Sequence, residues 1–467
     1  MLTVFRYSGI LHAIQSEHFH MIYTIIKTLE ETSSSLVKET ILKNNANNNV
    51  LKTFFYLALE PKINFYIKKL EKSYPTGYSN DVELAMQELS ALSDRKVTGN
   101  AAKDFVKNLM GCLTLETQEV IRRIILKKPQ CGVSSTTVNK IWDSLVTDVP
   151  YMRCSLPKEV DFENIQWHEG VYSDLKADGM FTNVSVQSDG TVLFESRNGS
   201  PFPTEYFTKI IEALGSNLNR QFHGECVVYR SGQMLTRSIS NGIMNSILKG
   251  GELDPDCEIR FFAWDTIPLE EAKPKNKYRV QYKVRRALLE DIISKIPEGS
   301  PVSLIESKMV YSYEEALSHY KEIRRRKLEG TVIKLQTMIW EDTTSKGQIK
   351  MKAEFDCELR ILGFKDADPT SKNAHLFGSI LMGTDDGQLE VGVTGIPDDL
   401  RAEIHQNRDS LIGAICTVTS NELLEPSKTN PKYSLFLPRL TEFDRKDKDE
   451  TDTVDRIKKI IESLLED

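Results

Sequence analysis

Two hydrophobic periodicities divide the chain. Between residues 21 and 145, apolar side chains recur every three or four positions, as in "MIYTIIKTLEE", "NVLKTFFYLALEPKINFYIKKL" and "ETQEVIRRIILKK". This spacing predicts amphipathic helices. Pro129 ends the last run, and Gly132 precedes a new helix through Val138 and Ile141. We therefore expect an all-α domain at 21–148.

Beyond residue 150, apolar and polar residues alternate. The stretch "VYSDLKADGMFTNVSVQSDGTVLFESRNG" has Asp-Gly pairs at 178–179 and 189–190, which predicts strand, turn, strand, turn, strand. Further strands are predicted at "GECVVYRSG", "IRFFAWDTIP", "EGTVIKL" and "IKMKAEFDCELRILGF". Helical patterns intervene at "EYFTKIIEALG", "QYKVRRALLEDIISKI" and "SYEEALSHYKEIRRRKLEG". The sequence therefore predicts an α+β domain at 149–354.

The last third is again rich in strands. Short strands are predicted at "CELRILGF", "LFGSILMGTDDGQLEVGV", "ICTVTSNEL" and "YSLFLPRL". Four or five short strands in so few residues indicate a small β-barrel of the OB-fold type at 355–450. A charged C-terminal tail at 451–467 holds one short amphipathic helix at most. Residues 1–20 form an N-terminal extension that we expect to be disordered.

Composition narrows the class of protein. A chain of 467 residues, 40% of them hydrophobic and 27% charged, is expected to form a soluble protein with several cores. No apolar run of about eighteen residues predicts a membrane span, and the first twenty residues do not resemble a signal peptide. The seven cysteines are scattered without a CxxC pair, which indicates reduced thiols, a cytoplasmic location and no zinc site.

The net charge of −7 counts mildly against nucleic-acid binding, because phosphate contacts need a basic surface. Local basic clusters nevertheless occur at "IRRIILKK" (121–128), "KEIRRRK" (321–327) and "DRKDK" (444–448). Each cluster is either a solvated helix face or part of a basic surface. The Gly132–Ser134 loop before its helix is likewise either an ordinary cap or an anion site suited to a DNA phosphate.

Charged and aromatic residues recur at strand ends in a fixed order. They are Lys176 in "KADG", Arg197 in "SRNG", Glu225 in "HGECVVY", Trp264 in "FAWD", Glu329 in "EGTVIK", Lys350 and Lys352 in "IKMK", and Arg445 and Lys448 in "RKDK". Each residue alone has an ordinary structural explanation, such as a core tryptophan or a solvated lysine. Lys350 and Lys352 alternate, so both point to one face of a strand.

Taken together, these motifs resemble those of the covalent nucleotidyltransferases, in particular the ATP-dependent DNA ligases. The similarity is greatest to ligases of T-even-type bacteriophages. It extends from about Met21 to "RKDK" and includes "TGNAA" at 98–102 and "CGVS" leading to "NKIW" at 131–142. The resemblance implies a helical DNA-binding domain at 21–148, a nucleotidyltransferase (adenylation) domain at 149–354 and an OB-fold domain at 355–450.

The chemistry implied by this resemblance suits the residue types. Lys176 would attack the α-phosphorus of ATP, because a lysine phosphoramidate can form and later be broken. Neighbouring cations favour the neutral amine, and Lys350, Lys352 and a bound Mg²⁺ would supply them while cancelling phosphate charge. Glu329 and Glu225 offer the oxygen ligands that Mg²⁺ prefers.

The resemblance also implies roles for other positions. Trp264 would stack on adenine, Asp174 would accept from the adenine amino group, and Glu225 would hold the ribose. Arg445 and Lys448 would orient pyrophosphate, and Arg197 would bind the 5′-phosphate of the nick. Asp178 and Lys334 are further nucleotide-contact candidates, and the DNA-contact candidates in the helical region are Gly132, Ser134 and Lys140.

One position departs from the family pattern. Family members usually carry arginine at the second residue after KxDG, where it contacts the ribose, whereas this chain has Phe181. Either this contact is missing or Phe181 is simply packed. The expected activity is ATP-dependent sealing of nicked double-stranded DNA by a monomer, in the host cytoplasm if the protein is phage-encoded.

Other functions remain open from the sequence. An RNA ligase or mRNA-capping enzyme would share the lysine but not the helical region. An NAD-dependent ligase would be expected to carry a four-cysteine zinc module. A DNA-binding clamp that has lost catalysis is suggested by Phe181.

Overall fold

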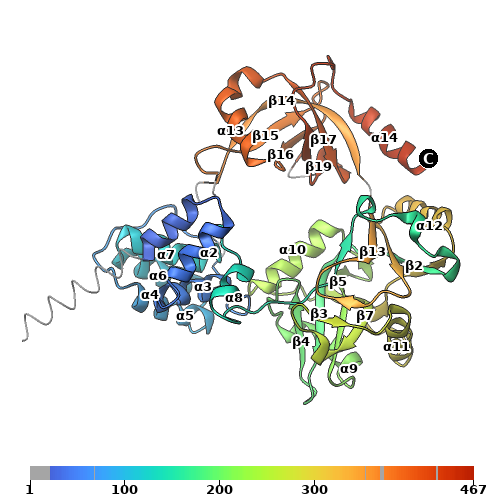
Figure 1. Ribbon diagram of the computed structural model, residues 1–467, viewed down its shortest axis with the longest axis horizontal. Helices are drawn as coiled ribbons and strands as arrows, with labels where there is room; N and C mark the ends of the chain where they lie inside the picture. Colours follow the sequence, from blue (N-terminus) through green and yellow to red (C-terminus); the bar gives the residue numbers. More distant parts are fainter. Residues whose placement is uncertain (1–21, 68, 353, 369–372, 428–429, 467) are drawn as a thin grey trace, which may run out of the picture. The chain divides into compact units, whose positions relative to one another are not determined.

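The computed structural model (Figure 1) describes the whole chain apart from residues 1–21, 68, 353, 369–372, 428–429 and 467. The expectation for residues 1–20 therefore lies outside the described residues. The chain forms two compact units, each assembled from segments that are separated in the sequence. The first unit comprises Met1–Arg153, Asp178–Ile305 and Thr337–Thr344, and the second comprises Cys154–Ala177, Glu306–Gln336 and Ser345–Asp467.

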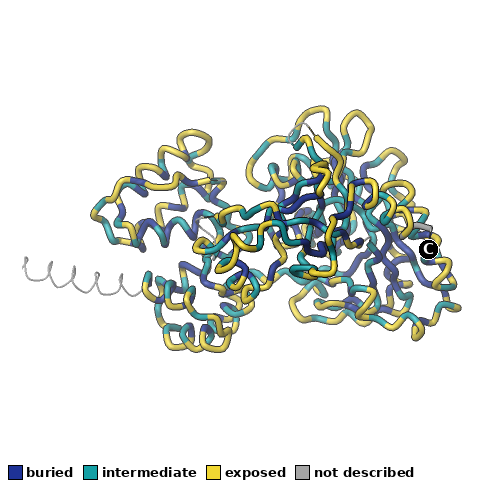
Figure 2. Tube along the Cα trace, turned by 90° about the horizontal axis from the view of Figure 1, so that it is seen from above, coloured by how far each residue is buried: buried dark blue, intermediate teal, exposed yellow. Residues whose placement is uncertain are grey.

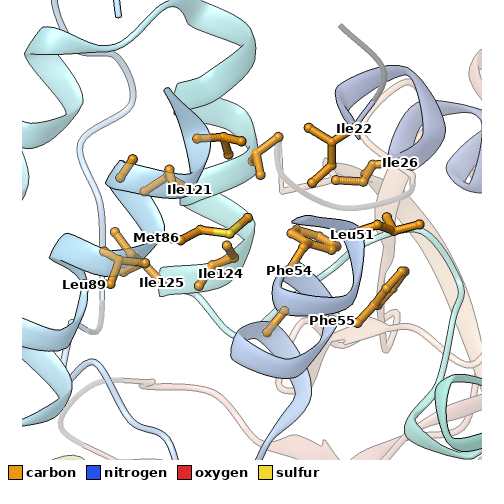
Figure 3. Close-up of a cluster of buried hydrophobic side chains, with 14 of the residues drawn as sticks. Ile22, Ile26, Leu51, Phe54, Phe55, Met86, Leu89, Ile121, Ile124 and Ile125 are labelled. Carbon is orange, nitrogen blue, oxygen red and sulfur yellow. The ribbon is translucent and has the colours of Figure 1, made fainter. Parts of the chain in front are cut away.

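The N-terminal part of the first unit is helical, as the 3.6-residue periodicity predicts. A helical segment at 22–31 is followed by α2 (Ser35–Asn44), α3 (Asn49–Leu59), α4 (Val82–Glu88), α5 (Ser90–Ser93), α6 (Gly99–Cys112), α7 (Leu115–Ile125) and α8 (Ser135–Ile141). Figure 3 shows Phe54 of α3 pointing toward Ile22 and Ile26, with Ile121 of α7 in the same cluster. These buried residues give the helical part a hydrophobic core of its own.

Of the stretch 49–70, whose apolar spacing predicts helix, only Asn49–Leu59 is helical among the described residues. Helix α3 ends at Leu59, because the following Pro61 disfavours helical dihedrals at Glu60. The Lys127 ammonium then donates to the Leu57 and Glu60 carbonyl oxygens, both at 2.7 Å, and so satisfies groups that the broken helix leaves open. Burial lowers the pKa of Lys127 to about 8.

A six-stranded sheet forms the rest of the first unit. Its order is β4 (Val192–Ser196), β3 (Met180–Val186), β5 (Arg220–Arg230), β7 (Cys257–Pro268) and β9 (Val302–Leu304), with β6 (Gln233–Met234) pairing β5. Helices α9 (Thr208–Leu214), α10 (Arg237–Leu248) and α11 (Tyr282–Ser294) contribute residues to the core on one face. Along β7, Ile259, Phe261 and Ala263 are buried, which leaves Trp264 on the other face. Figure 2 shows how buried and exposed stretches are distributed along the chain.

The second unit contains a five-stranded sheet. Its order is β1 (Arg153–Ser155), β13 (Thr344–Lys352), β11 (Gly330–Leu335), β2 (Val171–Leu175) and β10 (Ser307–Val310), and α12 (Tyr313–Arg325) packs on it. Strands β2 and β3 belong to different sheets. The first Asp-Gly turn therefore connects two sheets instead of closing a hairpin, whereas the second, at 189–190, does join the paired strands β3 and β4.

A second five-stranded sheet lies in the C-terminal part. Its order is β16 (Glu390–Val393), β15 (Phe377–Gly383), β14 (Phe355–Asp366), β17 (Ile415–Ser420) and β20 (Arg439–Glu442), flanked by α13 (Asp398–Asn407) and the pair β18 (Glu422–Leu424) and β19 (Ser434–Phe436). Among the described residues, no strand pairing closes this sheet into a barrel. The amphipathic helix α14 (Val454–Glu466) buries Val454 and Ile457 in the same core.

The remaining elements are short. A two-stranded ribbon in the first unit pairs β8 (Lys277–Tyr278) with β12 (Trp340–Glu341). Single 3₁₀ turns occur at Pro157–Glu159, Phe162–Asn164, Trp167–Glu169, Thr204–Phe207, Leu269–Glu271 and Arg408–Leu411. Within the part of the chain that the structure describes, no helix is both long and apolar enough to cross a membrane.

Candidate active site

Lys176 lies directly after β2, in the second unit. Its backbone N–H donates to the Gly330 carbonyl at 2.9 Å, so the chain stays in register with β11 one residue beyond the strand. Its ammonium lies 2.5 Å from a carboxylate oxygen of Glu329, and both side chains are about one-fifth exposed. The structure thus holds the lysine and the glutamate side by side, each within reach of solvent.

Strand register brings three more cations to this sheet. Val332 of β11 lies between Asp174 of β2 and Lys350 of β13, so these side chains share one face. Lys334 and Lys352 lie two residues from those positions and therefore point to the same face. The prediction that Lys350 and Lys352 share a face is confirmed by this pairing. Such a cluster of ammonium groups attracts an anion such as a polyphosphate.

Asp174 is engaged in a buried ion pair. Its carboxylate lies 2.7 Å from the Lys334 ammonium, with side-chain exposures of only 2% and 5%, and also accepts from the Ser307 hydroxyl at 2.6 Å. Removing one member of such a pair would leave an unpaired buried charge. A carboxylate has about four acceptor positions, and the contacts to Lys334 and Ser307 do not use all of them. The contact that we expect between Asp174 and adenine stays a prediction.

Lys352 is also paired. Its ammonium lies 3.1 Å from Glu354 and donates to the Asn421 side-chain oxygen at 3.3 Å, while Arg439 lies 2.8 Å from the same Glu354 oxygen. Although partial burial raises the pKa of Glu354, the hydrogen bonds from Arg439 and Lys352 lower it to about 2. Lys352 would have to exchange this partner for a phosphate before it could act on a nucleotide.

Arg445 is surrounded by acceptors in the C-terminal sheet. Its guanidinium makes a two-pronged contact with Asp447 at 2.8 and 2.7 Å, and its remaining nitrogen lies 3.2 Å from Glu358 and 2.8 Å from Glu442. The hydrogen bond to Asp447 is the largest of the effects that raise the pKa of Arg445. The Lys448 N–H donates to the Arg445 carbonyl. Orienting pyrophosphate would again require an exchange of partners.

Glu225 and Gly179 meet in the first unit. The Gly179 N–H donates to a Glu225 carboxylate oxygen at 2.8 Å. A Cβ on Gly179 would lie 2.4 Å from the Cys226 carbonyl oxygen, so only glycine fits here. Asp178 lies 3.0 Å from Arg237, the first residue of α10. The Asp-Gly pair of KADG is therefore fixed on both sides.

Phe181 is packed between aromatic rings. Its ring meets Tyr151 edge-on, with centroids 4.7 Å apart, and lies 5.8 Å from the Trp264 ring. Phe181 pairs with Glu225 across β3 and β5, so these two side chains share one face of the sheet. Of the two alternatives that the sequence leaves open, this geometry favours packing over a vacant contact. The Trp264 backbone carbonyl accepts from the Tyr282 hydroxyl at 2.9 Å.

The candidates in the helical region have local structural partners. Gly132 has φ +64°, and a Cβ there would collide with the Lys38 ammonium, which donates to the Cys131 carbonyl at 2.7 Å. Ser134 caps α8 by accepting from the Thr137 N–H at 3.3 Å. Lys140 is exposed and lies 3.1 Å from Glu39. The ordinary cap is thus what the structure shows for Ser134.

The candidates are distributed over both units. The second unit holds Asp174, Lys176, Glu329, Lys334, Lys350, Lys352, Arg445 and Lys448, and the first holds Gly132, Ser134, Lys140, Asp178, Arg197, Glu225 and Trp264. Sequence patterns missed Tyr151, Arg237 and Ser307. Tyr151 lies in a connecting segment without a motif, and only the helix start in "TRSISN" singles out Arg237.

Glu329 and Glu225, which belong to different units, are each of the ligand type that Mg²⁺ prefers. Among the described residues, no cluster of three or more His, Cys, Asp or Glu side chains could hold a metal by itself. Mg²⁺ usually takes one or two carboxylates, with waters and phosphates completing its shell. Glu329 and Glu225 match that requirement in type, each with one carboxylate.

Comparison with known proteins gives consistent results. Residues 157–352 match a family model described as the ATP dependent DNA ligase domain. The chain is 28% identical over 478 aligned positions to the DNA ligase of Enterobacteria phage T4, covering 90% of this chain and 94% of that protein, and equally similar to the DNA ligase of phage T6.

Solved structures share the fold. One named Pmar-Lig_Pre superposes with a TM-score of 0.67 at 22% identity over 91% of this chain and 99% of its own. Another, Pmar-Lig_PreS3, gives 0.66 at 21% identity, covering 90% and 98%. The resemblance indicated by the motifs is confirmed by the family match and the relatives.

Proposed function

From its confirmed resemblance to the ATP-dependent DNA ligases, we propose that this chain seals nicks in duplex DNA by using ATP. The observation that carries the proposal is the position of Lys176. It lies at a strand end beside Glu329, on a sheet whose face presents Lys334, Lys350 and Lys352. A lysine nucleophile beside a polyphosphate site is what transfer of AMP to an enzyme requires.

The reaction consists of three nucleotidyl transfers. The Lys176 amine attacks the α-phosphorus of ATP, its N–P bond forms, the bond to pyrophosphate breaks, and the amine loses a proton. The 5′-phosphate of the nick then attacks the same phosphorus, and the lysine leaves as an amine. Finally, the 3′-hydroxyl attacks the activated 5′-phosphate, and AMP departs.

The remaining residues bind and orient the reactants. Lys350 and Lys352 neutralise the phosphates, Trp264 stacks on adenine, and Glu225 holds the ribose. Lys334 fixes Asp174 near the base, and Arg445 and Lys448 orient the leaving pyrophosphate. Mg²⁺, held by Glu329 and Glu225 with the phosphates, would supply charge stabilisation.

We assign three parts to the function. Residues 21–148 bind DNA through Gly132, Ser134 and Lys140, residues 149–354 carry out adenylation, and residues 355–450 form an OB-type domain followed by a tail at 451–467. The open five-stranded sheet with α13 between β16 and β17 supports an OB-type fold. A cytoplasmic monomer is the state in which we expect the protein to act.

The proposal is tested by incubating the purified protein with ATP and Mg²⁺ and measuring its intact mass. One added AMP is expected, and it should disappear when a DNA duplex with a 5′-phosphorylated nick is supplied. A protein that binds nicked DNA but never acquires AMP would instead be a non-catalytic clamp. Transfer of GMP from GTP would indicate a capping-type enzyme.

A further inference from the structure

Tyr151 lies between two groups that the proposed function uses. The Arg197 guanidinium lies over the Tyr151 ring, with its central carbon 4.5 Å from the ring centroid. The same ring meets Phe181 edge-on, with ring centroids 4.7 Å apart. Phe181 in turn contacts Trp264 at 5.8 Å. One aromatic series thus connects the arginine expected at the 5′-phosphate with the tryptophan expected at adenine.

The segment that carries Tyr151 is firmly held. The Tyr151 N–H donates to Asp342 at 2.9 Å, and the second oxygen of Asp342 accepts from the Lys275 N–H at 2.9 Å. Two residues earlier, Val149 packs so closely on Gly199 that a Cβ at Gly199 would lie 2.4 Å from a Val149 methyl group. Gly199 has φ +82° and ends the "SRNG" turn that carries Arg197. The segment and the turn are therefore fitted to each other.

Stacking has a specific effect on an exposed arginine. A guanidinium lying flat on a ring keeps its N–H groups in its own plane, where they can bind a phosphate with two parallel hydrogen bonds. The contact also restricts a side chain that would otherwise sample many rotamers. Arg197 is exposed, and no ion pair is found for it within the described part of the chain. The ring is thus its observed support.

We propose that Tyr151 is a positioning residue for Arg197, and that it orients the guanidinium toward the 5′-phosphate of the nick. The inference rests on the proposed function. It also gives Phe181 a role, because the Phe181 ring packs against Tyr151. Phe181, which replaces the arginine usual in the family, and Tyr151 are thus parts of the same ring cluster.

The test compares single-turnover transfer of AMP from the adenylated protein to a nick. Tyr151→Leu keeps bulk but removes the ring face, and Tyr151→Ala removes both. We expect either change to slow transfer roughly five- to thirtyfold, the range that corresponds to cation–π energies at partly exposed sites. Tyr151→Phe should restore most of the lost rate, because it keeps the ring that lies against the guanidinium.

Two comparisons separate positioning from a general structural effect. Tyr229→Ala removes a similar stack, in which Arg260 lies 4.2 Å from the ring, and should not change the transfer rate. The preference for a 5′-phosphate over a 5′-hydroxyl nick in binding should fall in Tyr151→Leu and Arg197→Ala alike. In the double variant Arg197→Ala, Tyr151→Leu, the losses should not add, because both act through one guanidinium.

The outcomes are distinct. Unchanged transfer in Tyr151→Leu, or losses that add fully in the double variant, would overturn the inference. If the unmodified protein does not acquire AMP from ATP, the proposed function is overturned instead. In that case the 5′-phosphate preference in binding still decides whether Tyr151 acts through Arg197.

Discussion

Lys176 and Glu329 are joined by an ion pair of 2.5 Å at the end of strand β2. This pair places the proposed nucleophile beside a carboxylate on a sheet that also carries Lys350 and Lys352. Lys176→Ala should abolish AMP attachment in the intact-mass assay while leaving the fold unchanged, since a partly exposed side chain contributes little to a core. The variant should still seal DNA that is already adenylated, because the last step does not use the amine.

A matched control comes from the same sheet. Lys308 on β10 pairs with Ser173 and is exposed. Lys308→Ala should attach AMP as the unmodified protein does. Adenylation of the Lys176→Ala protein would refute the assignment.

The buried pair of Asp174 and Lys334 predicts a stability effect. Asp174→Asn or Lys334→Met should lower the free energy of unfolding by about 3–5 kcal/mol, because one charge is left buried without its partner. Denaturant unfolding measures this. The exposed pair Lys295–Asp291 serves as control, and Asp291→Asn should cost at most about 0.5 kcal/mol. Equal small losses at both pairs would contradict the prediction.

The aromatic packing of Phe181 predicts the result of Phe181→Arg. The substitution removes ring contacts with Tyr151 and Trp264 and should lower the free energy of unfolding by about 1–3 kcal/mol. Measuring thermal stability and the KM for ATP on the same variant decides between the two alternatives. A stable variant with a lower KM would mean that a ribose contact is missing and that packing is secondary.

His319 predicts how stability depends on pH. Its ring nitrogen lies 2.8 Å from the Ser173 hydroxyl under strand β2, and burial lowers the pKa of His319 from its usual value. The unfolded chain, with a histidine pKa of about 6.5, therefore binds this proton more readily than the folded one. The stabilisation is present above about pH 6.5 and is lost as pH falls below it.

Denaturant unfolding between pH 5 and 7.5 tests this dependence. His319→Gln, which can still bond to Ser173, should flatten the curve in that range. Glu354, whose folded pKa is held near 2, loses its stabilisation only as pH falls below about 5, so its effect is confined to the low end of this range. An unchanged slope in the variant would exclude His319 as the source.

Because the helical region has a core of its own, we expect that it can be removed without loss of AMP attachment by the rest of the chain. A chain that starts at Pro150 loses the helical core but keeps every strand, so it should still acquire AMP while binding nicked DNA far more weakly. Binding by the full chain should fall steeply with added salt, as release of counterions from phosphates requires. Equal affinity with and without the helical region would contradict its proposed role.

Local patterns predicted elements better than their connections. Alternation placed Lys350 and Lys352 on one face correctly, because strand geometry alone determines it. The apolar spacing around Pro61 suggested a continuing helix, although one proline ends it. The turn at KADG looked like a hairpin, since no local signal shows that its two strands join different sheets. Tyr151 could not be found from sequence, because its role depends on contact with residues 30 and 46 positions away.

The interleaving of the two units bears on how the chain folds during synthesis. Strand β2 pairs with β11 and β10, which follow it by more than a hundred residues, and β11 pairs with β13. The sheet that carries Lys176 therefore cannot assemble until the ribosome has released residues beyond Lys352. Such long-range pairings raise the contact order and slow folding. The helical region is one continuous stretch of the chain with a core of its own, so it can fold first, before the segment that carries the nucleophile finds its partner strands.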